Sequence, residues 1–71
     1  MEEKMKLSKI LKKGDIITVY QKRGSNWRLS VLDVDDGRGM ALLDPRPIRP
    51  NMGPGWYEIK ISKRGIPYAE G

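Results

Sequence analysis

Four carboxylates fall close together in the chain, at Asp33, Asp35, Asp36 and Asp44. Such side chains can act as general acids and bases, or hold a hard cation such as Mg²⁺ or Ca²⁺ through their oxygens. On a strand, Asp33 and Asp35 would share a face about 6.6 Å apart, from a rise of about 3.3 Å per residue. However, Arg38 is expected opposite Asp35, a turn uses Asp36, and no further ligand converges. We therefore expect no metal site and no catalytic residue.

The chain also lacks the side chains on which most nucleophilic and zinc chemistry depends. It has no His and no Cys among its 71 residues, which removes imidazole and thiolate ligands and disulfides. No glycine-rich phosphate loop, nucleophile elbow or zinc-ligand spacing occurs. So short a chain also leaves little room for an enclosed pocket. We expect a protein that is not an enzyme, with no cofactor and no small-molecule substrate.

Basic and aromatic side chains offer another chemistry, the binding of a polyanion. The net charge is +5, of which residues 1–26 contribute +4, residues 27–44 contribute −2 and residues 45–71 contribute +3. Cations displace counterions from phosphates, and aromatic rings stack on the bases of single strands. Lys63 and Tyr68 could add to either group. The candidate residues for contact with nucleic acid or another partner are Tyr20, Lys22, Arg28, Arg46, Arg49, Trp56, Lys60 and Arg64.

Two functions fit these residues. The first is the binding of nucleic acid, DNA or RNA, through a basic and aromatic face centred on Arg46, Arg49, Trp56 and Lys60. The alternative is a protein–protein interaction module that uses much the same surface, either as an adaptor or as an inhibitor of the kind that a virus or plasmid encodes. A barrel that serves a larger nucleoprotein machine, or a charge that serves solubility alone, would also fit.

The element expected to position these side chains is a hairpin over residues 27–44, WRLSVLDVDDGRGMALLD. Asp36 and Gly37 predict a two-residue type I′ turn, because Asp-Gly tolerates the positive φ that both central positions require. That turn places Asp35 opposite Arg38 as a cross-strand ion pair. The register of the whole hairpin follows from this turn.

The apolar face of the first hairpin strand changes sides. Trp27, Leu29 and Val31 alternate on one face, whereas Leu32 and Val34 fall on the other. A strand that is apolar on both sides is usually bulged or bent. This pattern is typical of a small, strongly curved barrel.

A short helix is expected inside residues 2–13. Leu7, Ile10 and Leu11 share one face at i, i+3, i+4 spacing, and Gly14 is expected to end the helix. A helix of this length is marginal alone, so the apolar stripe should dock on the barrel.

Two more strands complete the expected sheet. Residues 15–22 are rich in β-branched and aromatic side chains. Residues 56–63 alternate, with Tyr57, Ile59 and Ile61 expected in the core and the tryptophan before them on the polar side. A short closing strand or 3₁₀ turn should follow at residues 66–68. The last three residues, 69–71, are expected to make few contacts.

The connection over residues 44–55 contains four prolines and two glycines, so neither a helix nor a central strand can run through it. It presents Arg46 and Arg49 on a stiffened backbone. Residues 47–50 also fit PxxP, a polyproline II ligand, although prolines often serve only to stiffen a surface loop.

Residues 12–44, KKGDIITVYQKRGSNWRLSVLDVDDGRGMALLD, resemble the opening of Tudor-type SH3-like barrels. The shared features are a Gly-Asp before the first strand, a Trp-Arg that opens the second, and a turn followed by a third strand ending in Asp. The resemblance is more specific for fold than for function. In eukaryotic Tudor domains an aromatic cage binds methylated Lys or Arg, which implies Tyr20 and Trp27 as cage walls. Here Pro45 and Arg46 stand where those domains commonly continue with an aromatic residue.

The sequence thus predicts an all-β fold, an SH3-like small barrel of about five strands with a short N-terminal helix. Residues 1–13 form the helical segment and residues 14–71 the barrel domain. Apolar runs extend over only two or three residues, and the N-terminus is too charged for a signal peptide. We expect a cytoplasmic protein with no membrane partner.

Overall fold

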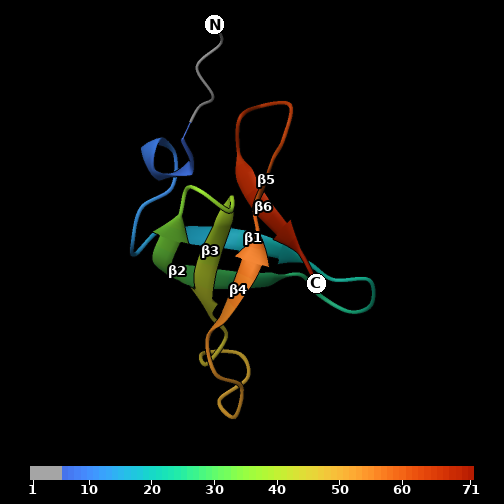
Figure 1. Ribbon diagram of the computed structural model, residues 1–71. Coiled ribbons are helices and arrows are strands. Elements are labelled where there is room, and N and C mark those ends of the chain that lie inside the picture. The colour runs from blue at the N-terminus through green and yellow to red at the C-terminus, as the bar shows by residue number, and fades with distance from the viewer. Residues whose placement is uncertain (1–5) are drawn as a thin grey trace, which may run out of the picture.

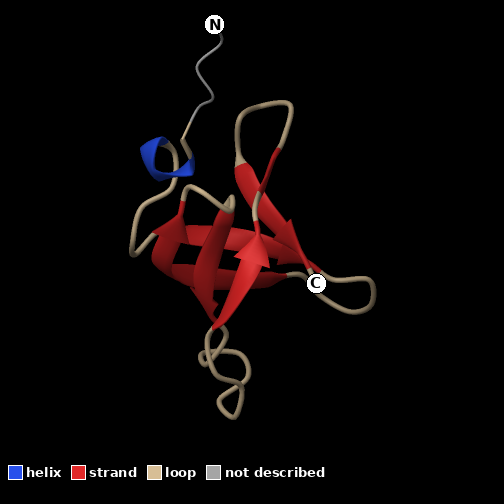
Figure 2. Cartoon of the chain, in the orientation of Figure 1, coloured by secondary structure: helices blue, strands red, loops and turns tan. Residues whose placement is uncertain are grey.

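The computed structural model describes residues 6–71 and shows an all-β protein with a single helical turn (Figures 1 and 2). The strands form one mixed sheet in the order β4-β3-β2-β1-β6-β5, antiparallel except for the β1–β6 pair. The sheet curls into a half-barrel (Figure 1). No helix within residues 6–71 has the length and apolar character needed to cross a membrane. The elements are η1 (Leu7–Lys9), β1 (Ile16–Tyr20), β2 (Trp27–Asp35), β3 (Met40–Asp44), β4 (Gly55–Glu58), β5 (Lys60–Ile61) and β6 (Pro67–Glu70).

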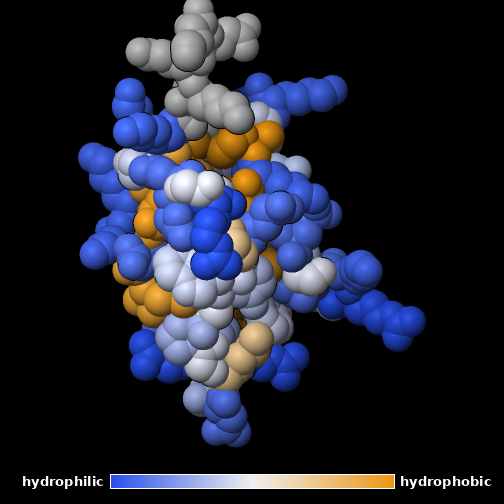
Figure 3. All heavy atoms as spheres, viewed as in Figure 1, coloured by the Kyte–Doolittle hydropathy of each residue, from blue (hydrophilic) through white to orange (hydrophobic). Residues whose placement is uncertain are grey.

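The core lies on the concave side of the sheet, where alternate residues of the strands meet. Their period of two puts one face of each strand inside and leaves the other outside. Figure 3 shows that hydrophilic side chains cover most of the visible surface, with hydrophobic surface only in small separate areas. The buried apolar side chains are Leu7, Leu11, Ile17, Val19, Leu29, Val31, Ala41, Leu43 and Ala69.

The predicted change of apolar face in β2 is confirmed as a β-bulge. Val31 pairs with Leu43, but Asp33 pairs with Leu42, so that Leu32 is an extra residue on β2. The extra residue restores the apolar phase of the strand, and the valine that follows Asp33 packs against the core. The bulge lets one long strand serve a strongly curved sheet.

The predicted two-residue type I′ turn is wrong. Asp35 pairs with Met40, which leaves residues 36–39 as a four-residue loop in which Gly39 has a φ of 65°. Asp35 and Arg38 do meet, but within this loop rather than across two strands: the Arg38 N–H donates to the Asp35 carboxylate at 3.2 Å, and the guanidinium lies 4.0 Å from it. The positive φ that this loop requires is therefore found at its last residue, Gly39.

Asp36 has a different task, because it fastens the N-terminal segment to this loop. The Ser8 N–H and hydroxyl donate to its two carboxylate oxygens at 2.7 and 2.6 Å. The Ser8 hydroxyl, and then its N–H, lower the pKa of Asp36 below its ordinary value of 3.8. The wider loop leaves this carboxylate available to Ser8.

The predicted helix is reduced to η1, one 3₁₀ turn, and residues 1–5 of the predicted segment lie outside the described residues. Docking of the apolar stripe is confirmed, since Leu7 and Leu11 are buried and Ile10 packs against the same core. So short a turn owes its stability to this packing rather than to helix formation.

The predicted strand over residues 56–63 is divided at Ile59, where the chain leaves β3 as its partner and takes up β6. Tyr57 and Ile59 pack against the core as predicted, but Ile61 is 47% exposed, so its assignment to the core is wrong. The reason is that β5 runs past the core into a projecting turn (Figure 1).

The expectation of a loosely held C-terminus is also wrong. Strand β6 lies between β1 and β5, and Ala69 is fully buried. The Gly71 N–H donates to the Tyr20 carbonyl at 2.8 Å. The last residues are therefore a central part of the sheet.

We expect the Ser8–Asp36 contact to make folding stability depend on pH. The pKa of Asp36 is lower in the folded protein, so the contact stabilises the fold above the ordinary value of 3.8 and is lost as the pH falls through the folded value. Asp36→Asn and Ser8→Ala should therefore destabilise the protein in urea unfolding at about pH 6 and much less at about pH 2.5. Glu58→Gln, at an exposed site, is the control, and an equal loss at both pH values would contradict the prediction.

Candidate nucleic-acid interface

Strand register decides which of the candidate residues meet on the outer face of the sheet. Thr18 of β1 pairs with Arg28 of β2 on one side and with Tyr68 of β6 on the other. Tyr68 pairs in turn with Lys60 of β5. Because side chains in register project from the same face, these four residues form a row across four strands.

Two tyrosines form the aromatic part of this face. Tyr20 follows Thr18 by two residues on the same side of β1, and its ring lies 5.5 Å from that of Tyr68, at 80°, in an edge-to-face contact. Tyr20 is 47% exposed. A shallow pocket of about 340 Å³ lies beside the pair, lined by Tyr20, Ser62, Lys63, Arg64, Ile66 and Tyr68.

The charges of this face are mostly uncompensated. Lys60 bonds to Glu70, which raises the pKa of Lys60 and lowers that of Glu70. Lys22 follows the last residue of β1, Tyr20, by two residues, and its charge adds to the lowering of the Glu70 pKa. Lys22, Arg28 and Arg64 are exposed and have no ion pair within residues 6–71. We call this surface the basic–aromatic face, made of Tyr20, Lys22, Arg28, Lys60, Lys63, Arg64 and Tyr68.

Arg46 is held by the carboxylate of a neighbouring residue. Its Nε and Nη2 donate to the two carboxylate oxygens of Asp44 at 2.8 and 2.9 Å, and its N–H donates to the same group at 3.1 Å. This fork raises the pKa of Arg46 and lowers that of Asp44. Arg46 therefore holds the start of the loop after β3.

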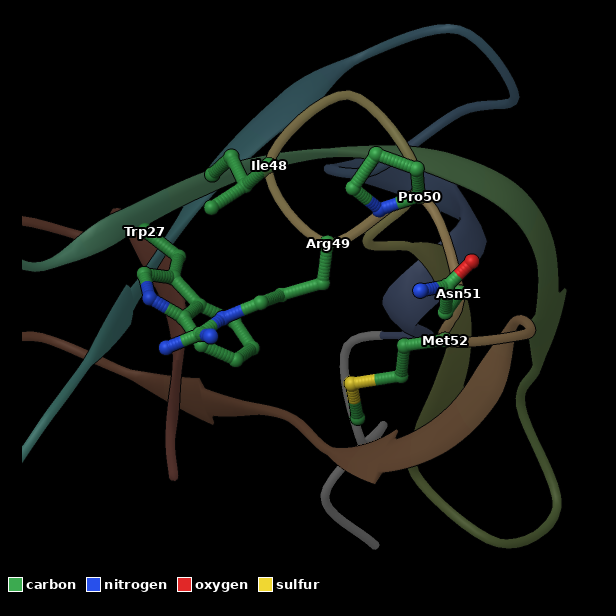
Figure 4. Close-up of a pocket in the computed structure, with 6 residues that line it drawn as sticks. All are labelled: Trp27, Ile48, Arg49, Pro50, Asn51 and Met52. Carbon is green, nitrogen blue, oxygen red and sulfur yellow. The ribbon is translucent and has the colours of Figure 1, made fainter.

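Arg49 lies away from the basic–aromatic face, in the proline-rich loop of residues 45–54 between β3 and β4. Its guanidinium carbon lies 5.6 Å from the ring centre of Trp27, a cation–π contact (Figure 4). Trp27 pairs with Val19 and so belongs to the inner face, where it packs against the core. Trp27 therefore lies on the inner side of the sheet, not on the outer side with Tyr20.

Trp56 is 41% exposed, on the polar side of its strand as predicted, but its neighbours are acidic. It pairs with Leu42, which pairs in turn with Asp33, and Glu58 follows on the same side of β4. We call this surface, Asp33, Leu42, Trp56 and Glu58, the Trp56 face. The four residues expected at the centre of one interface are therefore divided, with Trp56 and Lys60 in different surroundings.

Sequence reasoning placed Tyr68 and Lys63 only at the margin, yet Tyr68 lies at the centre of the basic–aromatic face. Its importance depends on the parallel pairing of β6 with β1, which joins residues fifty positions apart. One feature of the sequence pointed to this face: Tyr20 lies in phase with Thr18 on β1, and its side chain is exposed. As for metals, no group of three or more potential ligands comes together in the described part of the chain.

Comparison of the chain with protein-family models, with curated proteins and with solved structures gave no significant match. The function of the interface is therefore inferred from its geometry and charge.

Proposed function

We propose that this protein is a non-enzymatic, SH3-like barrel domain that binds nucleic acid through the basic–aromatic face. The observation that carries the proposal is the row formed by Arg28, Thr18, Tyr68 and Lys60, with the exposed ring of Tyr20 beside it. Cations and aromatic rings on one rigid sheet are what a nucleic-acid strand requires of a binding surface.

The arrangement favours single-stranded nucleic acid over a duplex. Arg28 and Arg64 lie at two sides of the tyrosine pair, so phosphates can follow the cations while a base stacks on Tyr20. In a duplex the faces of the bases are covered by their neighbours, and only the phosphate contacts remain. The face should therefore bind single strands more tightly than duplexes.

Two features support the SH3-like part of the proposal: the resemblance of residues 12–44, and the strongly curled sheet built around the β2–β3 hairpin. Recognition of methylated side chains is not included in it. Tyr20 projects from the outer face of β1, whereas Trp27 pairs with Val19 on the inner face, so the two rings do not line one cage.

A salt series tests the proposal. Labelled single-stranded DNA, single-stranded RNA and duplex DNA are titrated with the protein and followed by fluorescence anisotropy. With about three phosphate contacts, the logarithm of the affinity for single strands should fall by about 2 per tenfold increase in salt. Absence of binding at low salt, or binding that does not respond to salt, would reject nucleic acid as the ligand.

One observation favours a second function, a protein–protein interaction module. Trp56 is a large exposed side chain with Asp33 and Glu58 on its face, where phosphates would be repelled. Aromatic residues of this kind are often hot spots of protein interfaces. The charge of the surrounding residues indicates a basic partner surface. The two functions use different parts of the outer side of the sheet, so one protein could perform both.

A further inference from the structure

One end of the basic–aromatic face is hollowed into the pocket of about 340 Å³ that lies beside the tyrosine pair. The rest of its lining comes from the turn between β5 and β6, which contributes Ser62, Lys63, Arg64 and Ile66. This turn projects beyond the rest of the sheet (Figure 1). Because these residues border one cavity, a ligand group that is seated there meets several of them at once.

The two cations of this pocket are free to bind an anion. Lys63 and Arg64 are exposed, and neither forms an ion pair with any residue between 6 and 71. No acidic residue occurs between Glu58 and Glu70, and the carboxylate of Glu70 is bonded to Lys60. Two unpaired positive charges therefore stand side by side at the turn, whereas Arg28 lies two strands away, on β2.

The turn also offers a hydroxyl group as a hydrogen-bond donor. The Ser62 Oγ accepts the N–H groups of Arg64 and Ile66 at 3.3 and 3.1 Å. Both bonds use lone pairs of the oxygen, so the hydroxyl proton remains available to a ligand. The same turn is fixed by two backbone bonds, from the Gly65 N–H to the Ser62 carbonyl and from the Ser62 N–H to the Ile66 carbonyl, both at 2.9 Å. The donors of the pocket are therefore attached to a well-defined turn.

We propose that this pocket holds the terminal phosphate of a nucleic-acid strand. A phosphate monoester carries about 1.5 to 2 negative charges at neutral pH, more than the single charge of a phosphodiester inside a strand. Two adjacent cations and a hydroxyl donor suit the larger charge and its several acceptor oxygens. The site extends the proposed function and rests on it, because it requires a nucleic acid on the basic–aromatic face.

The position of the pocket also suits the end of a strand better than its middle. The turn forms a wall of the pocket, and a phosphodiester needs an exit for the chain on both sides, whereas a terminal group needs only one. The terminal nucleoside can lie against Ile66, which is 57% exposed, and the tyrosines beside it. Arg28 lies two strand spacings from β6, or about 10 Å, and is placed for a phosphate further along the strand.

The test compares three forms of a thymidine decamer that carries an internal fluorescein label. One form has a phosphate at the 5′ end, one has a phosphate at the 3′ end, and one has hydroxyl groups at both ends. In anisotropy titrations with the full chain, at least one phosphorylated form should bind about tenfold more tightly than the unphosphorylated form. The form that binds more tightly identifies the end that the pocket holds.

Two arginine variants show whether the pocket is responsible. Arg64→Ala, at an exposed site, should reduce the preference for the phosphorylated form to about twofold or less. Arg28→Ala is the matched control, because it removes the same side chain from the same face outside the pocket. It should weaken the binding of all three forms and leave the preference unchanged.

Three results would overturn the terminal-phosphate site: equal affinity for the three forms, an unchanged preference in Arg64→Ala, or an equal loss of preference in Arg28→Ala, which would indicate attraction by net charge alone. If all three forms bind equally and respond to salt, the proposed function stands without this site. If none of them binds at low salt, both the site and the proposed function are rejected.

Discussion

Reversing the charges of Arg28 and Arg64 together, in the double variant Arg28→Glu with Arg64→Glu, is expected to lower the affinity for single-stranded nucleic acid by on the order of 100-fold or more at moderate salt. The two side chains are exposed, lie on either side of the tyrosine pair, and have no ion pair among residues 6–71. Each substitution removes a phosphate contact and adds a repulsive charge. Anisotropy titrations at several salt concentrations measure the effect, and the slope against salt should become shallower as well.

The matched control is Lys13→Glu with Arg38→Glu, which changes the net charge equally. Lys13 and Arg38 are exposed and pair only at 4.0 Å, with Asp33 and Asp35, so little stability is lost. If the position of the charges matters, this control keeps most of its affinity. An equal loss in both double variants would show that net charge alone drives binding, which contradicts an interface on the basic–aromatic face.

Trp56→Ala should leave nucleic-acid binding unchanged, because Trp56 lies among carboxylates and outside that face. The same substitution should abolish binding of a protein partner at the Trp56 face. A loss of nucleic-acid affinity in Trp56→Ala would support the single interface expected from the sequence, centred on Arg46, Arg49, Trp56 and Lys60.

The second large effect concerns the fold. Leu11 precedes the first strand, yet it is only 1% exposed and belongs to the central core. Leu11→Ala should reduce the free energy of unfolding by about 2–5 kcal/mol, the usual cost of removing a buried leucine side chain. A chain of this size has a total stability of about 4–10 kcal/mol, so this one substitution would remove a large part of it.

Urea unfolding followed by tryptophan fluorescence measures this loss. Ile16→Ala is the control: it also shortens an aliphatic side chain near the start of the sheet, but Ile16 is 56% exposed and should cost well under 1 kcal/mol. If Leu11→Ala proved as stable as Ile16→Ala, the N-terminal segment would not be part of the core.

Patterns that depend on near neighbours could be interpreted from the sequence. The period of two placed Ile17, Val19 and Leu29 in the core, and the change of apolar face after Val31 predicted the bulge. The spacing of the leucines before β1 predicted the docked stripe, and prolines predicted the long loop. In each case the structure is decided by the burial of one face or by a backbone constraint. Both depend on residues that are close together in the sequence.

Contacts between distant residues could not be interpreted in this way. Asp36 was assigned to a tight turn, but its carboxylate binds Ser8, twenty-eight residues away. The sequence also did not predict that Arg46 would form an ion pair with Asp44. A local pattern does not show which polar group will compete for a side chain, because that depends on what the fold brings near it.

The candidate interface shows the same division. An all-β protein with exposed cations and aromatic rings could be predicted from the residues alone, because composition and alternation depend on no distant partner. Which of these side chains share a surface depends on strand pairing: the parallel pairing of β6 with β1 brings Tyr68 beside Tyr20, while the pairing of β4 with β3 puts Trp56 among carboxylates. Strand order and register are set by how the whole sheet buries its inner face, and no single segment contains that information.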